Sequence, residues 1–503
     1  MPWKLWTFDV AREQSPSFDT LASAALASQN GGYDALGLYL EHRFAYPGIP
    51  WSQGSGCLQP SNVGRLREEF PSLDVVPFLN LLGHMEGFLY CEEGQAMAEE
   101  PMVGMQGNLW DGRFQELCSA IVEGTLDSFD SEVVHLGGDE AWQLNRHPDS
   151  VSRTEALDGD KKAWLYGQHF APYCEQVLAS GRRPALWADM ILEHPEAAHA
   201  IPRQTLLFDW QYRGGCAEST VKLQKLGFEV VCCPTMHVYD AAWAHLPESE
   251  QNIRSVAQDA KTVGSHGLCL TTWEAGLFGH YATVLPAVEW AGRVFVDPEI
   301  KESLVDAYGE SSDWAREMGV FLNHAAGPFS FDGHRSRLKC RLLLFGNPFL
   351  LWRHHAGELC GEPGKRALES LERAKAAAVT PEQAGVVSFV RAAIEFVRVT
   401  EVARTEYRAG NTEQCVSALA ILRRLFDDLA ALARHNALEA GGSMADVERC
   451  VAAKRHVETV ILRVRAYGQR ELGYLPAFEV LTDPRFVPHD QACWWIVNRW
   501  GLD

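Results

Sequence analysis

Short apolar runs alternate with helical stretches up to about residue 295, and this alternation limits the possible folds more than any other feature of the chain. Each run has the length of a buried strand, and the segments between the runs have the spacing of helices. Strands that alternate with helices form parallel sheets, and eight such units predict an α/β fold, a (β/α)8 TIM barrel. The predicted strands are Leu5–Asp9, Ala35–Leu40, Leu73–Leu79, Val133–Leu136, Pro184–Trp187, Thr205–Phe208, Glu229–Cys233 and Gly267–Thr272.

The strand pattern stops near residue 330, and the remainder of the chain has helical patterns. Thr380–Gln383 reads as a helix start, because Thr caps helices, Pro suits the first position, and Gln at the third completes a capping box. Apolar residues then follow at helical spacing: Val386, Val390, Ala393 and Val397. We therefore predict a (β/α)8 barrel over residues 1–330, followed by a C-terminal α-helical domain over residues 331–503.

Charge and composition exclude several classes of function. The formal net charge of -21 argues against nucleic acid, whose phosphates a strongly acidic protein repels. The sequence has no apolar span of membrane length and no apolar leader at its start, so we expect no membrane partner. The 13 cysteines are irregularly spaced without a Cys-x-x-Cys pair, which favours a reducing cytoplasm and argues against a zinc site.

The motif His135-Leu136-Gly137-Gly138-Asp139-Glu140 places two carboxylates directly after a predicted strand and two glycines. Active sites of (β/α)8 barrels lie at the carboxyl ends of the strands, where these acids fall. Adjacent carboxylates repel each other, so one tends to keep a proton in a partly dry site. A proton donor beside an anion is what cleavage of a glycosidic bond requires. The alternative is that the acids merely cap the next helix.

The full motif resembles the catalytic motif of family 20 glycoside hydrolases, the β-N-acetylhexosaminidases. Three further segments, Tyr39–Tyr46, Leu81–Glu86 and Leu186–Met190, are similar to segments of this family and of its hexosaminidase D-like branch, in the same order. The resemblance implies catalysis in which the acetamido oxygen of the substrate attacks C1. It implies that Asp139 orients the acetamido group and that Glu140 is the general acid and base.

The resemblance also implies a set of residues that bind the substrate. Aromatic side chains would wall the sugar and its acetamido methyl, although core packing would explain each of them too; these are Trp187, Trp210 and Trp273. Tyr239 would donate to the acetamido oxygen, and Glu274 would bind O4 or O6 unless it is a surface acid. His84 would tune Glu140, with a purely structural role as its alternative.

The cation that holds O3 and O4 departs from the family pattern. Relatives begin the first strand with an Arg-Gly pair, whereas this chain has Lys4-Leu5 there. Arg12 is our candidate for the cation, and Lys4 is the second choice. Glu41, at the end of the second strand, is expected to contact the sugar.

These observations predict an exo-acting β-N-acetylhexosaminidase that needs no metal or cofactor. Its partners would be small glycosides or oligosaccharides with a terminal N-acetylhexosamine, and the sequence leaves a homodimer open. One alternative is a barrel that binds carbohydrate without cleaving it. Another is a retaining β-glycosidase with an enzyme carboxylate as nucleophile, for which Glu274 is the candidate.

Overall fold

The computed structural model describes residues 2–11, 17–53, 57–100, 104–238, 243–273, 281–324, 356–357, 359–439 and 444–469. The chain divides into two compact units. The barrel unit comprises Met1–Met236, Glu248–Trp273 and Leu285–Leu304, and the helical unit comprises His237–Pro247, Glu274–Val284 and Val305–Asp503. The domain boundary predicted at residue 330 falls outside the described residues.

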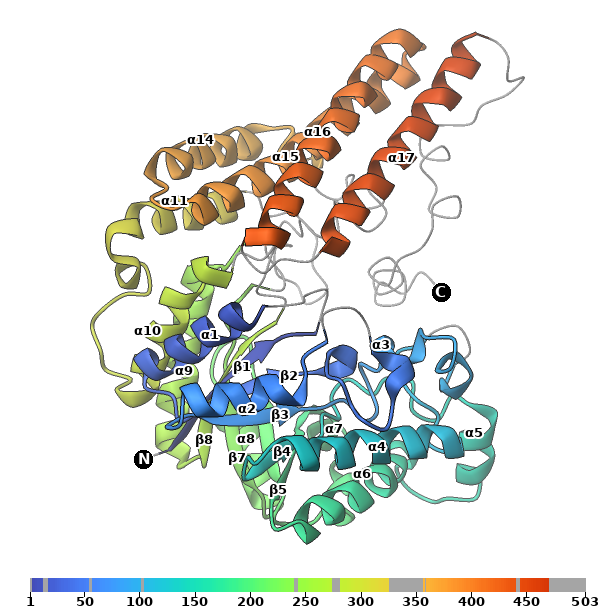
Figure 1. Cartoon of the computed structure of the whole chain (residues 1–503), viewed down its shortest axis with the longest axis vertical. Helices are drawn as coiled ribbons and strands as arrows, with labels where there is room; N and C mark the ends of the chain where they lie inside the picture. The colour runs from blue at the N-terminus through green and yellow to red at the C-terminus, as the bar shows by residue number, and fades with distance from the viewer. Residues whose placement is uncertain are drawn as a thin grey trace. The chain divides into compact units, whose positions relative to one another are not determined.

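Eight parallel strands close into a barrel in sequence order, which confirms the predicted fold (Figure 1). Strand β1 pairs with both β2 and β8, so the sheet has no free edge. The strands are β1 (Trp3–Asp9), β2 (Ala35–Tyr39), β3 (Asp74–Phe78), β4 (Val133–His135), β5 (Arg183–Trp187), β6 (Leu206–Trp210), β7 (Glu229–Cys233) and β8 (Gly267–Thr272).

Helices connect consecutive strands, and several begin at a polar cap that the sequence supplies. The Asp160 side chain accepts hydrogen bonds from the backbone N–H groups of Lys162 and Ala163 and starts α6. The helices are α1 (Phe18–Gly31), α2 (Pro60–Glu69), α3 (Glu86–Leu89), α4 (Gly112–Ser128), α5 (Pro148–Thr154), α6 (Lys161–Ala179), α7 (Asp189–Glu193), α8 (Ala217–Lys225), α9 (Leu246–Val263) and α10 (Leu285–Val296).

Aromatic rings pack around the buried His135. The ring of Phe78 stacks on the imidazole with centroids 4.4 Å apart, and Phe208 meets it edge-on at 4.7 Å. Trp187 lies 4.4 Å from the same imidazole. Because these residues come from β3, β4, β5 and β6, their packing fixes the relative heights of those four strands.

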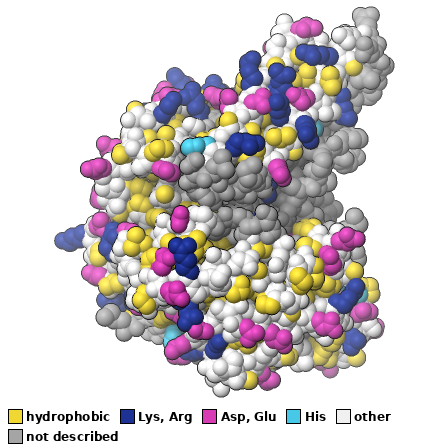
Figure 2. Space-filling model, viewed as in Figure 1, with side chains coloured by type: hydrophobic (Ala, Val, Ile, Leu, Met, Phe, Trp, Pro, Cys, Tyr) yellow, Lys and Arg dark blue, Asp and Glu magenta, His cyan; other side chains and the backbone are white. Residues whose placement is uncertain are grey.

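The helical unit contains α11 (Ser312–His324), α14 (Glu362–Ala377), α15 (Pro381–Arg408), α16 (Thr412–Glu439) and α17 (Met444–Gly468). Thr380 caps α15, and Gln383 completes the capping box, as the sequence predicts. The predicted apolar stripe of α15 is buried, and α16 packs along α17. Figure 2 shows Lys and Arg side chains over these helices with acidic ones between them, the mixed pattern of a solvated face.

The described residues contain neither a membrane-spanning helix nor a metal-binding cluster of side chains. No described helix is long and apolar enough to cross a membrane. Within the same part of the chain, no group of three or more His, Cys, Asp or Glu side chains is arranged to hold a metal ion.

Candidate active site

The loop after β4 brings the two predicted acids to the carboxyl end of the barrel. Gly137 and Gly138 both have positive φ, of 81° and 95°. A Cβ at Gly137 would lie 2.5 Å from the carbonyl oxygen of Leu79, and one at Gly138 would lie 2.5 Å from the hydroxyl of Tyr166. Only glycine fits both requirements, so the pair lets the chain turn sharply out of the strand and deliver the acids.

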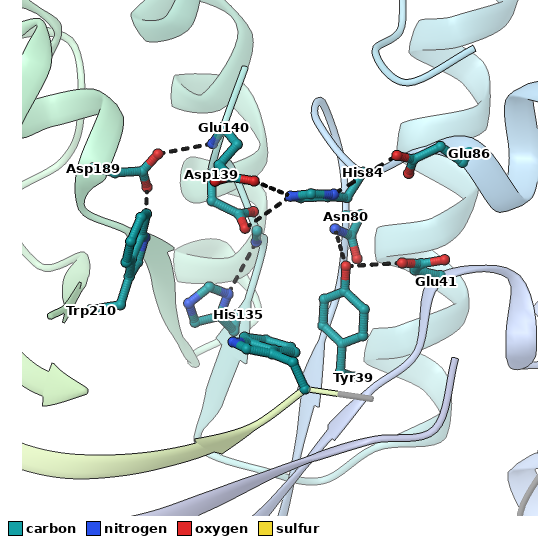
Figure 3. A network of polar contacts seen from close by, with 12 residues as sticks. Tyr39, Glu41, Asn80, His84, Glu86, His135, Asp139, Glu140, Asp189 and Trp210 are labelled. Carbon is teal, nitrogen blue, oxygen red and sulfur yellow. Dashed lines mark hydrogen bonds and ion pairs between the residues drawn. The ribbon is translucent and has the colours of Figure 1, made fainter. Parts of the chain in front are cut away.

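One ring nitrogen of His84 faces both carboxylates, and the other faces Glu86 (Figure 3). Its Nε2 is 3.4 Å from Oδ2 of Asp139 and 3.2 Å from Oε2 of Glu140, and its Nδ1 faces Glu86 at 3.9 Å. An imidazole nitrogen that faces two carboxylate oxygens must carry its proton there. The acid side chains are only 13% and 17% exposed, so this N–H acts in a partly dry site.

Three of the residues around these acids adopt a backbone conformation that is unusual outside glycine. Positive φ angles occur at Glu41 (40°), His84 (54°) and Glu140 (47°). Such conformations are unfavourable by about 1–3 kcal/mol each and persist where the surroundings enforce them, often at functional sites. Their concentration around one pair of carboxylates therefore points to this end of the barrel as the working site.

Asp189, the first residue of α7, joins the acid loop to the next strands. Its Oδ2 accepts the backbone N–H of Glu140 at 2.8 Å, and its Oδ1 accepts the indole N–H of Trp210 at 3.2 Å. Burial and the neighbouring charge of Asp139 raise the pKa of Asp189 well above its ordinary value. Sequence reasoning placed Asp189 at a strand end, two residues after Trp187, but gave it no role in the site.

A second polar chain runs along the side of β2 and β3. The Tyr39 hydroxyl donates to Oε1 of Glu41 at 3.0 Å and accepts from the Asn80 side-chain amide at 2.9 Å (Figure 3). Glu41 is buried, with an exposed fraction of 6%. Tyr39 and Asn80 are therefore further site residues that the sequence analysis did not single out.

Two of the three predicted tryptophans contact a tyrosine that the sequence analysis missed. The Trp273 indole donates to the Tyr212 hydroxyl at 2.6 Å, and the Tyr212 ring lies 5.0 Å from that of Trp210. Trp187 meets Trp273 edge-on at 5.8 Å but is only 1% exposed, so most of its surface packs in the core. Its indole nitrogen has no hydrogen-bond partner among the described residues.

His135 of the motif has a structural position below the acids. Its Nδ1 accepts the backbone N–H of Gly137 at 3.1 Å, which places the proton of the neutral ring on Nε2. Burial lowers the pKa of His135 to about 3. The imidazole therefore stays neutral and anchors the glycine turn.

The remaining predicted site residues are not all at this end of the barrel. Arg12, Tyr239 and Glu274 lie outside the described residues. Lys4 pairs with Asp34 at 2.8 Å, at the amino ends of β1 and β2, and this corrects its assignment as an alternative sugar-binding cation. In a parallel barrel the first residues of a strand lie at the end opposite the site, so Lys4 cannot reach the sugar.

The part of the chain that carries the acid pair and Asp189 also matches a protein family model. Residues 102–274 match the model described as the glycosyl hydrolase family 20 catalytic domain. Over this segment the barrel is similar to the catalytic domain of glycoside hydrolase family 20. The match includes Asp139, Glu140 and Asp189, and the protein is accordingly a glycoside hydrolase. The hexosaminidase D-like branch stays a prediction.

Solved structures of low sequence identity resemble the chain. A β-N-acetylhexosaminidase from Bacteroides fragilis is 14% identical over 63% of this chain and 71% of its own, with a TM-score of 0.48. An exo β-N-acetylglucosaminidase of family 20 from Vibrio harveyi is 12% identical over 58% and 54%, with a TM-score of 0.47. A Streptomyces plicatus β-hexosaminidase variant with the product GlcNAc is 12% identical over 58% and 63%, with a TM-score of 0.41. No curated protein sequence matches the chain significantly.

Proposed function

We propose that the protein is an exo-acting β-N-acetylhexosaminidase that removes terminal β-linked GalNAc or GlcNAc with retention of configuration. One observation carries this proposal: adjacent carboxylates, Asp139 and Glu140, share His84 at the carboxyl end of a family 20 barrel. Both acid side chains are largely shielded from solvent, which is the setting in which a proton donor and a fixed anion act most strongly on a bound sugar.

In the first step, the acetamido oxygen of the substrate attacks C1 while Glu140 protonates the departing glycosidic oxygen. Asp139 accepts the acetamido N–H and stabilises the positive charge of the oxazolinium ring that forms. In the second step, Glu140 is a carboxylate and removes a proton from water, which attacks C1 and opens the ring. The nucleophile belongs to the substrate, so the reaction needs no cofactor.

The experiment is a comparison of three nitrophenyl β-glycosides that differ in the group at C2. The β-GlcNAc and β-GalNAc glycosides should be cleaved, and the β-glucoside should not, because glucose has no acetamido group. A thiazoline that mimics the oxazoline ring should inhibit the cleavage. Equal cleavage of the glucoside would instead indicate an enzyme carboxylate as nucleophile, and sugar binding without cleavage would indicate a non-catalytic barrel.

A further inference from the structure

Glu140 has a strained backbone, and one hydrogen bond to a side chain holds its amide. Its φ of 47° is a conformation that side chains other than glycine rarely adopt. The N–H of the same residue donates to Oδ2 of Asp189 at 2.8 Å. Since this peptide directs the carboxyl group of Glu140, any change in its orientation moves the acid relative to the glycosidic oxygen.

The other oxygen of Asp189 holds an aromatic residue of the same site. Oδ1 accepts the indole N–H of Trp210 at 3.2 Å, so a single carboxylate joins the ends of β4, β5 and β6 (Figure 3). Both donors are neutral, and each takes a different oxygen. A side chain with two acceptor atoms in this arrangement is therefore required, and Asp is the shortest that provides them.

The surroundings of Asp189 are otherwise unfavourable for a carboxylate. Asp139 and Glu140 lie close enough for their charges to disfavour its ionisation, and burial acts in the same direction. Tyr166, whose buried hydroxyl faces Gly138, also interacts with it electrostatically. Packing alone does not explain an acid at this position, because an apolar side chain of similar volume would fill the space without burying an ionisable group.

We propose that Asp189 is a positioning residue. It fixes the orientations of the general acid Glu140 and of the Trp210 indole that catalysis requires. This inference rests on the proposed function, because it assigns Glu140 the role of acid. A displaced acid slows the departure of groups that need protonation, whereas a dinitrophenolate leaves without a proton. The effect of Asp189 should therefore depend on the leaving group.

The test uses Asp189→Asn and Asp189→Ala, each alone and combined with Trp210→Phe. In Asp189→Asn, the amide oxygen can still accept from Glu140, but its NH2 group then opposes the indole N–H. We expect kcat for N,N′-diacetylchitobiose to fall by about a hundredfold, with a much smaller loss for the dinitrophenyl glycoside. Adding Trp210→Phe removes the opposing donor, so the double variant should be no slower than Trp210→Phe alone. Asp189→Ala leaves the Glu140 N–H without its acceptor and should not be rescued in this way.

Asp209→Asn is the matched control. Asp209 is a fully buried acid on β6, and its oxygens accept from Gln211, Ser219 and Thr220 rather than from the acid loop. Its substitution should leave the ratio of the two kcat values unchanged. Equal losses on both substrates in Asp189→Asn, or losses of Asp189→Asn and Trp210→Phe that simply multiply, would overturn the proposal.

The wild-type assay separates this inference from the proposed function. If the wild type cleaves no N-acetylhexosaminide, the proposed function fails and the coupling is measured by thermal unfolding instead. Destabilisation by Asp189→Asn that disappears in the Trp210→Phe background would support the double hydrogen bond. Additive destabilisation would exclude it.

Discussion

The two ends of the barrel carry acids in opposite electrostatic settings. At the amino end, Asp34 pairs with Lys4, and Glu229 pairs with both Arg183 and His266. At the carboxyl end, Asp139 and Glu140 both face Nε2 of His84, and Asp189 accepts the neutral N–H groups of Glu140 and Trp210. The same eight strands thus present compensated charge at one end and crowded acids at the other.

The difference indicates that the features unfavourable for folding are concentrated at the end of the barrel that carries the site. Paired surface charges at the amino end contribute little and could be replaced without loss of activity. The crowded acids and the positive φ angles at the carboxyl end are unfavourable for folding, and a site of this kind persists because the reaction uses it. The comparison therefore predicts opposite effects on activity and stability at the two ends.

Glu140→Gln should have the largest effect on activity. Glutamine cannot donate a proton, so kcat/KM on glycosides with poor leaving groups should fall by about 10²–10⁴-fold. Azide should restore part of the rate with a dinitrophenyl glycoside, because it attacks the intermediate without a general base. Steady-state kinetics on both substrates measures this effect, and full turnover by the variant would refute the assignment of Glu140.

Asp139→Asn should have the next largest effect, and a different dependence on the leaving group. The loss of a fixed anion beside the oxazolinium charge should lower kcat by about 10²–10³-fold. Because that charge forms whatever group departs, the dinitrophenyl glycoside should be affected as strongly as chitobiose. A loss confined to poor leaving groups would mean that Asp139, and not Glu140, is the acid.

The elements of this site differ in how far the sequence could predict them. The strands were predictable because each is a short apolar run, and the acid pair because two glycines and two carboxylates follow β4 directly. The two contacts of Asp189 were not, because they depend on the relative positions of three strands that are distant in the sequence. Lys4 was misplaced because its assignment followed a family pattern, whereas its position at the start of β1 already set it at the opposite end.

The pH dependence of stability should have opposite signs at the two ends. At the carboxyl end, the folded protein raises the pKa of Asp189 from 3.8 to about 8, chiefly by burial, so the native state binds more protons than the unfolded state in that range. The stability of the wild type relative to Asp189→Asn should therefore fall as the pH rises from about 4 to 8. Chemical denaturation of both proteins at several pH values measures this slope.

Glu229 provides the contrast at the amino end. Burial opposes its ionisation, but Arg183 and His266 outweigh burial and lower the pKa of Glu229. The stabilisation is present above the ordinary value of 4.5 and is lost as the pH falls through the lowered pKa. The wild type should thus lose stability relative to Glu229→Gln on acidification. Slopes of the same sign for the two substitutions would contradict the contrast between the ends.

Asp34→Asn should have the smallest effect. The backbone N–H of Lys4 donates to the same Asp34 oxygen that pairs with its ammonium group, and an amide oxygen can still accept that hydrogen bond. Only the ion pair is lost, and Asp34 is 46% exposed, so the free energy of unfolding should fall by at most about 1 kcal/mol. The kcat should not change, because the pair lies at the end of the barrel away from the acids. A reduced kcat without a loss of stability would mean that charge at the amino end acts on the site, and the two ends could then no longer be treated as independent.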